Sequence, residues 1–189
     1  MSTRTLAIAD PILAEIIAAT ELPPLRPTGN VFHDLMSCVV EQQIHYRSTK
    51  NVFGKALERA ALTELTPENF DRFEEHGLSK LKLSLRKSET ILGVLNFWEK
   101  APADWSALTD AEVRKTLQAL PGIGPWTVDM MLLYSLERPD VFPVDDYHLK
   151  RAMARHYDLD PTVRLKPHMR EIASNWQPNR SLAVRYLLT

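Results

Sequence analysis

Residues 120–129 read LPGIGPWTVD, and this stretch predicts two helices joined by a very tight hairpin. Pro121 cannot continue the preceding helix because it has no N–H to donate. Gly122 and Gly124 permit positive φ and let the backbone approach a ligand closely. The amides that open the second helix then lack intrahelical partners and lie at its positive dipole end. The hairpin therefore predicts an anion site that needs no lysine and suits a DNA phosphate; a glycine-rich turn without a ligand is the plainer alternative.

A second stretch, residues 144–148 with the sequence VDDYH, places two carboxylates at the start of a later helix. Adjacent residues at a helix start point in different directions, so Asp145 and Asp146 cannot share one role. One is expected to cap the helix and the other to face a ligand. A plain N-cap is the alternative for either residue.

Composition limits the class of protein. The 189 residues are 44% hydrophobic and include one cysteine, Cys38. A single cysteine excludes an internal disulfide framework and a four-thiolate iron–sulfur cluster. No apolar run approaches the roughly 20 residues that span a bilayer, and the N-terminus lacks a signal-peptide pattern. We therefore expect a cytoplasmic protein without a membrane partner.

The net charge of −1 argues mildly against nucleic acid as a partner. Binding, however, needs a local basic face rather than a basic total. Two segments carry such clusters: Lys80, Lys82, Arg86 and Lys87 in one, and Lys150, Arg151 and Arg155 in the other. A solvated helix face is the alternative for each cluster taken alone.

Helical spacing of apolar residues predicts an almost entirely helical chain, and no pair of segments combines strand alternation with turn chemistry. Asp10-Pro11 marks one helix start, and the capping box at residues 109–112 marks another. We found no linker or internal repeat, so residues 1–189 are expected to form one domain. The later helices are expected over residues 31–43, 48–61, 79–98, 110–120, 125–136, 146–157, 163–176 and 179–188.

Residues 120–129 and 141–151 resemble the helix–hairpin–helix (HhH-GPD) DNA glycosylases, most closely the 3-methyladenine-DNA glycosylase II branch. Three more stretches resemble that branch: VVEQQI at 39–44, GLSKLK at 77–82 and WQPNRS at 176–181. The resemblance runs from about residue 32 to the C-terminus. It implies an all-α, bilobal fold with a cleft between two helical lobes, one formed by residues 32–144 and the other by residues 1–31 with 145–189.

The same resemblance implies a monofunctional DNA glycosylase for alkylated purines of the 3-methyladenine or 7-methylguanine type. Such an enzyme acts as a monomer on double-stranded DNA in base excision repair. The family pattern, aligned through residues 147–151, puts the catalytic carboxylate at Asp146 and leaves Asp145 as cap or support. A nearby negative charge stabilises the oxocarbenium-like sugar, and a carboxylate can orient or deprotonate the attacking water.

A lyase step is not expected. Family members that also cleave the strand place a lysine near the start of the hairpin's second helix, because the Schiff base needs an amine. This chain has Trp126 at that place. Hydrolysis alone is therefore predicted.

The target base must leave the stack to be reached, and the resemblance assigns residues to this step. Ile44, with Gln43 beside it, is the expected wedge, the side chain that fills the gap left by the flipped base. The alternative is that Ile44 is a residue of the hydrophobic core. Met130 and Leu188 stand where better-known members have aromatic residues, so the substrate range stays open. The expected base pocket consists of Trp126, Met130, His45 and Tyr46.

DNA phosphates are expected to contact Gly122, Gly124, Trp126, Thr127, Lys80 and Arg180. For Arg180, an ion-paired structural role is an equal alternative. No cofactor is required. The resemblance nevertheless implies that the backbone carbonyls of Gln118, Leu120 and Ile123 can hold Na⁺ or K⁺ that bridges to phosphate.

Two other functions are alternatives. A non-catalytic DNA-binding module would use the hairpin alone, and the presence of Asp146 in register argues against it. A glycosylase of the same fold for other damaged bases is disfavoured by the missing lysine and the missing cluster cysteines.

Overall fold

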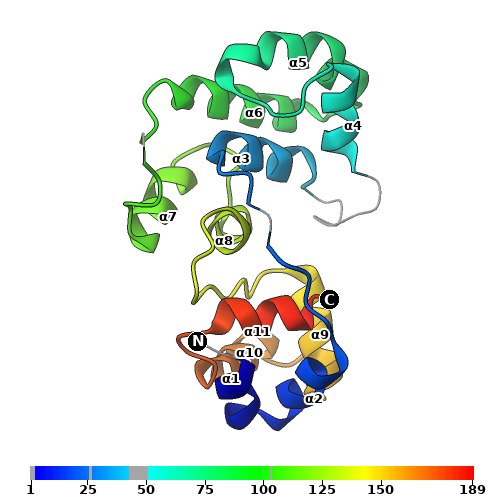
Figure 1. Ribbon diagram of the computed structural model, residues 1–189, viewed down its shortest axis with the longest axis vertical. Helices are drawn as coiled ribbons and strands as arrows, with labels where there is room; N and C mark the ends of the chain where they lie inside the picture. The colour runs from blue at the N-terminus through cyan, green and yellow to red at the C-terminus, as the bar shows by residue number, and fades with distance from the viewer. Residues whose placement is uncertain (1–2, 26, 43–50, 103) are drawn as a thin grey trace. The chain divides into compact units, whose positions relative to one another are not determined.

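The computed structural model describes residues 3–25, 27–42, 51–102 and 104–189, and every regular element in those ranges is helical (Figure 1). The all-α prediction is therefore confirmed for the described part of the chain. No helix there combines the length and apolar character that a membrane crossing requires. The elements are α1 (Thr3–Ala9), α2 (Pro11–Ala19), α3 (Val31–Val40), α4 (Val52–Arg59), η1 (Pro67–Asn69), α5 (Phe70–His76), η2 (Leu78–Lys80), α6 (Leu85–Trp98), α7 (Asp110–Gln118), α8 (Pro125–Met130), η3 (Met131–Ser135), α9 (Tyr147–His156), α10 (Leu165–Ser174) and α11 (Arg180–Leu187).

Several helices differ from their predicted bounds, and α6 and α8 differ most at a single end. The helix expected over residues 79–98 begins at Leu85, because Ser84 is its N-cap and residues 78–80 form a separate 3₁₀ turn. The helix expected over residues 125–136 begins at Pro125 as predicted, but its second half is the π-helix η3. The capping box of α7 is present, with the Thr109 hydroxyl accepting from Glu112 N–H.

The chain divides into two compact units. Unit 1 consists of residues 1–26 and 132–189, and unit 2 consists of residues 27–131. These boundaries differ from the predicted lobes, 1–31 with 145–189 and 32–144. Hydrogen bonds explain the difference at both ends. Asn30 Nδ2 donates to the Leu65 carbonyl of unit 2 at 3.0 Å, whereas Ser181 N–H donates to the Pro139 carbonyl of unit 1 at 3.1 Å.

Unit 1 is built around α11, which contacts α2 and α9 (Figure 1). A buried carboxylate, Asp10, joins three of its segments. Asp10 Oδ1 accepts from Leu13 N–H at 3.0 Å and so caps α2. Its Oδ2 accepts from Tyr157 Oη and from Trp176 Nε1, each at 2.8 Å. Burial and this hydrogen bond raise the pKa of the Tyr157 hydroxyl, so Tyr157 stays a donor and the ends of α9 and α10 remain tied to α2.

Unit 2 is built around α3, which contacts α4, α6 and α8. One face of α3 is fully buried, as its apolar spacing predicted. Phe32 on this face lies 5.0 Å from the Trp98 ring, and Trp98 in turn stacks on Trp105 at 5.5 Å. This packing joins the start of α3 to the end of α6, and Lys87 near the start of α6 donates to the Val40 carbonyl at the end of α3.

His33 gives unit 2 a predicted pH dependence. Its Nδ1 accepts from Leu65 N–H at 3.0 Å, and burial lowers the pKa of the imidazole. Because the pKa of His33 is lower in the folded protein, the neutral imidazole contributes its full stabilisation above about pH 6.5. This stabilisation is lost as the pH falls towards the folded-state pKa. We expect chemical denaturation to show the free energy of unfolding decreasing below about pH 6.5. The His33→Gln variant should show a weaker decrease; an identical pH profile in both proteins would contradict this assignment.

Candidate functional site

The hairpin between α7 and α8 requires glycine at one of its two glycine positions. Gly122 has φ of +84°, and a Cβ added there would lie 2.0 Å from Thr90 Oγ1. Gly124 instead has φ of −95° and ψ of 174°, which any residue adopts. A Cβ at Gly124 would meet no atom within 4 Å. Of the two glycines that permit positive φ, Gly122 adopts it and Gly124 does not. The missing side chain of Gly124 leaves open space.

An ion pair joins the two helices of the hairpin. Arg114 Nη2 on α7 lies 2.6 Å from Asp129 Oδ1 on α8, and the Asp129 side chain is only 9% exposed. Within the turn, Ile123 N–H donates to the Leu120 carbonyl at 3.1 Å. Both contacts fix the turn and α8 relative to α7.

A groove of about 340 Å³ runs beside the hairpin within unit 2. Three parts of the chain form its walls: Gln42 just after α3, the start of α6, and the hairpin with the first turn of α8. Trp126, one of the predicted base-pocket residues, is half-buried in this wall. The lining residues are Gln42, Ser84, Arg86, Lys87, Thr90, Gly122, Gly124, Trp126 and Thr127.

Gln42 connects the end of α3 to the hairpin. Its Nε2 donates to Thr127 Oγ1 at 3.1 Å and to the Gly122 carbonyl at 3.5 Å. The Thr127 side chain is buried, so its hydroxyl serves this contact. A phosphate contact by Thr127 would therefore use its backbone N–H, which lies in the first turn of α8.

Lys87 closes the end of α3. Its Nζ donates to the carbonyls of Val40 and Gln42, at 2.8 Å each. A cation at the carboxyl end of a helix is favourable because it meets free carbonyls and the negative dipole end. Burial lowers the pKa of this ammonium, with Glu41 opposing the shift. Glu41 itself accepts from Phe53 N–H at 3.0 Å, so the residues just after α3 are fixed on two sides.

The other predicted contacts of unit 2 lie outside the groove lining. Lys80 is exposed on η2, and Met130 is buried. The predicted residues Gln43, Ile44, His45 and Tyr46 lie outside the described residues. Arg86 and Lys87, which do line the groove, belong to one of the two basic clusters of the sequence. The sequence contains a signal that could have singled them out. The pattern Leu-Ser-x-x-Lys at residues 78–82 is repeated at residues 83–87, which include both residues.

Asp146, the predicted catalytic carboxylate, is itself the N-cap of α9 in unit 1. Its Oδ1 accepts from Leu149 N–H at 2.7 Å, and the residue is 6% exposed. Asp145 is half-exposed and pairs with Lys166 of α10. The hydrogen bond from Lys166 lowers the pKa of the Asp145 carboxyl. Of the two roles predicted for Asp145, cap or support, the cap is wrong, because Asp146 itself caps α9.

Tyr147 is a neighbour that sequence reasoning did not select. Its ring is 60% exposed and meets His148 edge-on, with ring centroids 5.2 Å apart. The Arg151 guanidinium lies 5.7 Å from the Tyr147 ring centroid. An exposed aromatic ring directly after the candidate carboxylate offers a stacking surface.

Arg180 makes a structural ion pair. Its Nε lies 2.7 Å from Asp140 Oδ1 and its Nη2 lies 2.8 Å from Asp140 Oδ2. The same Nη2 also donates to the Asp140 carbonyl at 3.1 Å. Of the two predicted roles for Arg180, the structure shows the ion-paired one, since Nε and Nη2 of the guanidinium both contact the Asp140 carboxylate.

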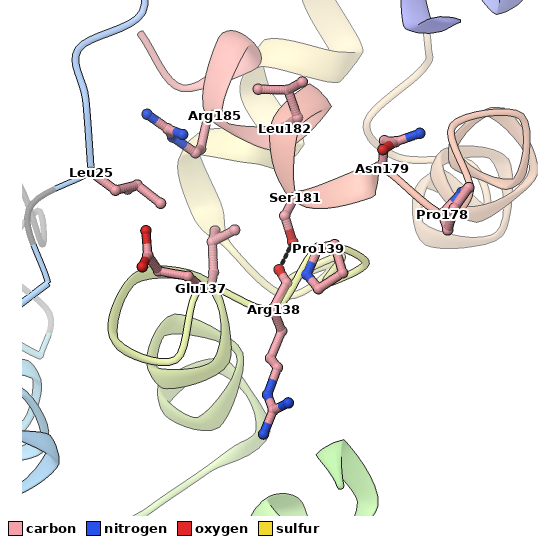
Figure 2. Close-up of a pocket in the computed structure, with 10 residues that line it drawn as sticks. Leu25, Glu137, Arg138, Pro139, Pro178, Asn179, Ser181, Leu182 and Arg185 are labelled. Carbon is pink, nitrogen blue, oxygen red and sulfur yellow. Dashed lines mark hydrogen bonds between the residues drawn. The ribbon is translucent and has the colours of Figure 1, made fainter. Parts of the chain in front are cut away.

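A second cavity, of about 460 Å³, lies within unit 1 beside this ion pair. Figure 2 shows the Ser181 hydroxyl directed at the Arg138 carbonyl, while the Arg138 side chain extends away from Ser181. The Ser181 hydroxyl also accepts from Val141 N–H at 2.9 Å. The polar groups here hold residues 138–141 against the start of α11, and none of the predicted site residues lines this cavity.

The family follows from comparison with known proteins. A model of the HhH-GPD superfamily of base excision DNA repair proteins matches residues 36–178. The chain belongs to this superfamily, and its hairpin and the helix capped by Asp146 both lie within the matched region.

Individual relatives narrow the similarity to one branch. The chain is 30% identical over 174 residues to YfjP of Bacillus subtilis, a DNA-3-methyladenine glycosylase by name, covering 87% of this chain and 60% of YfjP. It is 29% identical over 123 residues to DNA-3-methyladenine glycosylase 2 of Escherichia coli, covering 65% of this chain and 41% of that protein. The chain thus spans less than two thirds of the length of both proteins.

A solved structure shares the fold. The DNA-3-methyladenine glycosidase of Bacillus halodurans superposes with a TM-score of 0.75 at 28% identity. The match covers 98% of this chain and 86% of that one. The predicted superfamily and its 3-methyladenine branch are confirmed.

Proposed function

We propose that this chain is a monofunctional DNA glycosylase that flips alkylated purines out of double-stranded DNA and hydrolyses their N-glycosidic bond. The observation that carries the proposal is Asp146, a buried carboxylate held by Leu149 N–H at the start of α9. The superfamily and the names of its relatives support the class of reaction.

The carboxylate supplies electrostatic stabilisation. Breaking the N-glycosidic bond leaves positive charge on the sugar, and a fixed negative charge beside it lowers the barrier. The same group can orient or deprotonate the attacking water. An alkylated purine already carries positive charge and leaves readily, so a strong general acid is less necessary. Asp146 is fixed by its cap hydrogen bond, which removes the need to reorient it during the reaction.

Trp126 is proposed to contact the flipped base. Its ring is half-buried and lines the groove beside the hairpin. A cationic base over an indole face gains roughly 0.5–2 kcal/mol. The wedge role of Gln43 and Ile44 and the pocket roles of His45 and Tyr46 stay predictions.

The hairpin is proposed to hold a backbone phosphate through the amides at the start of α8. Contacts of this kind position a protein on DNA without reading sequence. The carbonyls of Gln118, Leu120 and Ile123 suit a monovalent cation, because they are neutral oxygens at a helix end and in a turn. Gln118 ends α7, where carbonyls lack intrahelical partners. Such a cation would add positive charge beside the phosphate.

Hydrolysis without strand cleavage is proposed because no described residue that lines the groove beside the hairpin presents an unbound amine for a Schiff base. Trp126 occupies the place of the family's lysine nucleophile. Among the groove-lining residues Lys87 carries an amine, and its Nζ is held by two carbonyls. A Schiff base would need that nitrogen released and deprotonated.

Base release tests the proposed function. Duplex DNA containing 3-methyladenine, 7-methylguanine or ethenoadenine is incubated with the purified chain, and free bases are quantified by mass spectrometry. We expect release above the enzyme-free rate for at least one alkylated purine, and intact strands until alkali is added. DNA binding without release of any base would favour a non-catalytic module, and strand nicking by the pure protein would contradict the monofunctional assignment.

A further inference from the structure

Arg86 is a charged groove residue that the proposed mechanism leaves unused. It lies in the first turn of α6 and its side chain is exposed. The groove's other cation, Lys87, is occupied by the carbonyls at the end of α3. Arg86 forms no ion pair with another described residue. Its guanidinium is therefore available to an anion that enters the groove.

The hairpin determines where Arg86 lies. Thr90, one turn further along α6, donates from Oγ1 to the Arg86 carbonyl at 2.9 Å. The same Thr90 side chain is the group that a Cβ at Gly122 would strike. Ser84 caps this turn by accepting from Lys87 N–H. The start of α6 thus packs directly on the hairpin, and residues four apart on a helix share one face.

We infer that Arg86 binds a second backbone phosphate of the DNA, flanking the phosphate held at the hairpin. This inference rests on the proposed DNA-binding function. A planar guanidinium matches two phosphate oxygens at once, which an ammonium does not. Gly124 and Trp126 form the facing wall of the same groove. Two phosphates held on one rigid unit would fix the direction of the strand as well as its position.

The salt dependence of DNA binding tests this assignment. Fluorescence anisotropy is measured on a labelled undamaged duplex over a KCl series, with wild type, Arg86→Gln and Arg86→Lys. Removing one phosphate contact lowers the slope of log K against log salt by about one and weakens binding equally on unrelated sequences. We expect this loss in Arg86→Gln and a slope close to wild type in Arg86→Lys.

Arg72→Gln is the matched control, because Arg72 is an exposed arginine of the same unit that lies outside the groove lining. It should keep the wild-type slope, and thermal unfolding should be unchanged in all three variants. An unchanged slope in Arg86→Gln, or an equal loss in Arg72→Gln, would overturn the inference. DNA binding with the predicted Arg86 effect but without base release would support the phosphate site while rejecting the glycosylase. Wild-type protein that does not bind DNA would reject both.

Discussion

Replacing Gly122 with alanine is expected to lower the free energy of unfolding by roughly 2–5 kcal/mol. The left-handed conformation at φ of +84° costs a residue with a Cβ about 1–2 kcal/mol. The added methyl also meets Thr90 Oγ1 at 2.0 Å, and forced contacts in packed regions typically cost about 1–3 kcal/mol. Chemical denaturation of the purified variant measures the sum. A variant as stable as wild type would show that the hairpin does not have this conformation.

Gly124→Ala is the matched control for that experiment. Its backbone is extended and its Cβ would meet no protein atom, so we expect wild-type stability. The methyl would instead project where a phosphate approaches the hairpin. Losing a charge-assisted hydrogen bond of about 1.5 kcal/mol weakens DNA binding by about tenfold. Gly124→Ala with unchanged DNA affinity would place the phosphate elsewhere.

Replacing Asp146 with asparagine is expected to lower base release by about 100- to 1,000-fold, the usual loss when a preorganised electrostatic group is removed. The fold should not change, because asparagine caps helices as well as aspartate does and keeps an oxygen for Leu149 N–H. Asp146→Ala removes the cap as well and should cost about 1 kcal/mol of stability in addition. Calorimetry and base release on both variants separate the cap role from the catalytic role.

Asp145→Asn is the control for the Asp146 variants, since it neutralises the adjacent carboxylate. The Asp145 side chain is 41% exposed and pairs with the 48% exposed Lys166, and such partly exposed pairs contribute little to stability. We expect base release within about threefold of wild type, which corresponds to the roughly 0.5 kcal/mol that exposed substitutions usually change.

The hairpin and the caps of α2 and α7 could be predicted from sequence because their signals are local. Pro121, Gly122 and the capping box at Thr109 act on backbone within three or four residues, and all three act where expected. The start of α6 could not be predicted in the same way. Ser79 and Ser84 both follow a leucine, so the local sequence does not distinguish them as the N-cap. In the structure Ser84 is the N-cap, and Thr90 of the same helix packs on Gly122, more than 30 residues away in the sequence.

Long-range contacts also decided the roles of the two aspartates and the extent of the units. From the sequence, either aspartate could cap α9. In the structure Asp146 is the cap, and Asp145 pairs with Lys166 instead. Residues 138–141 belong to unit 1 because Ser181 and Arg180 bind them from 40 residues further along the chain. No local pattern in residues 132–144 contains that information.

Single-turnover release of 7-methylguanine from duplex DNA, with enzyme in saturating excess, tests the central claim most directly. Wild type and Asp146→Asn are compared, and affinity for abasic DNA is measured on the same preparations. Hydrolysis assisted by Asp146 predicts a rate constant at least about 100-fold lower in Asp146→Asn, with affinity for abasic DNA unchanged. Equal rate constants for the two proteins would contradict the assignment of Asp146 as the catalytic carboxylate.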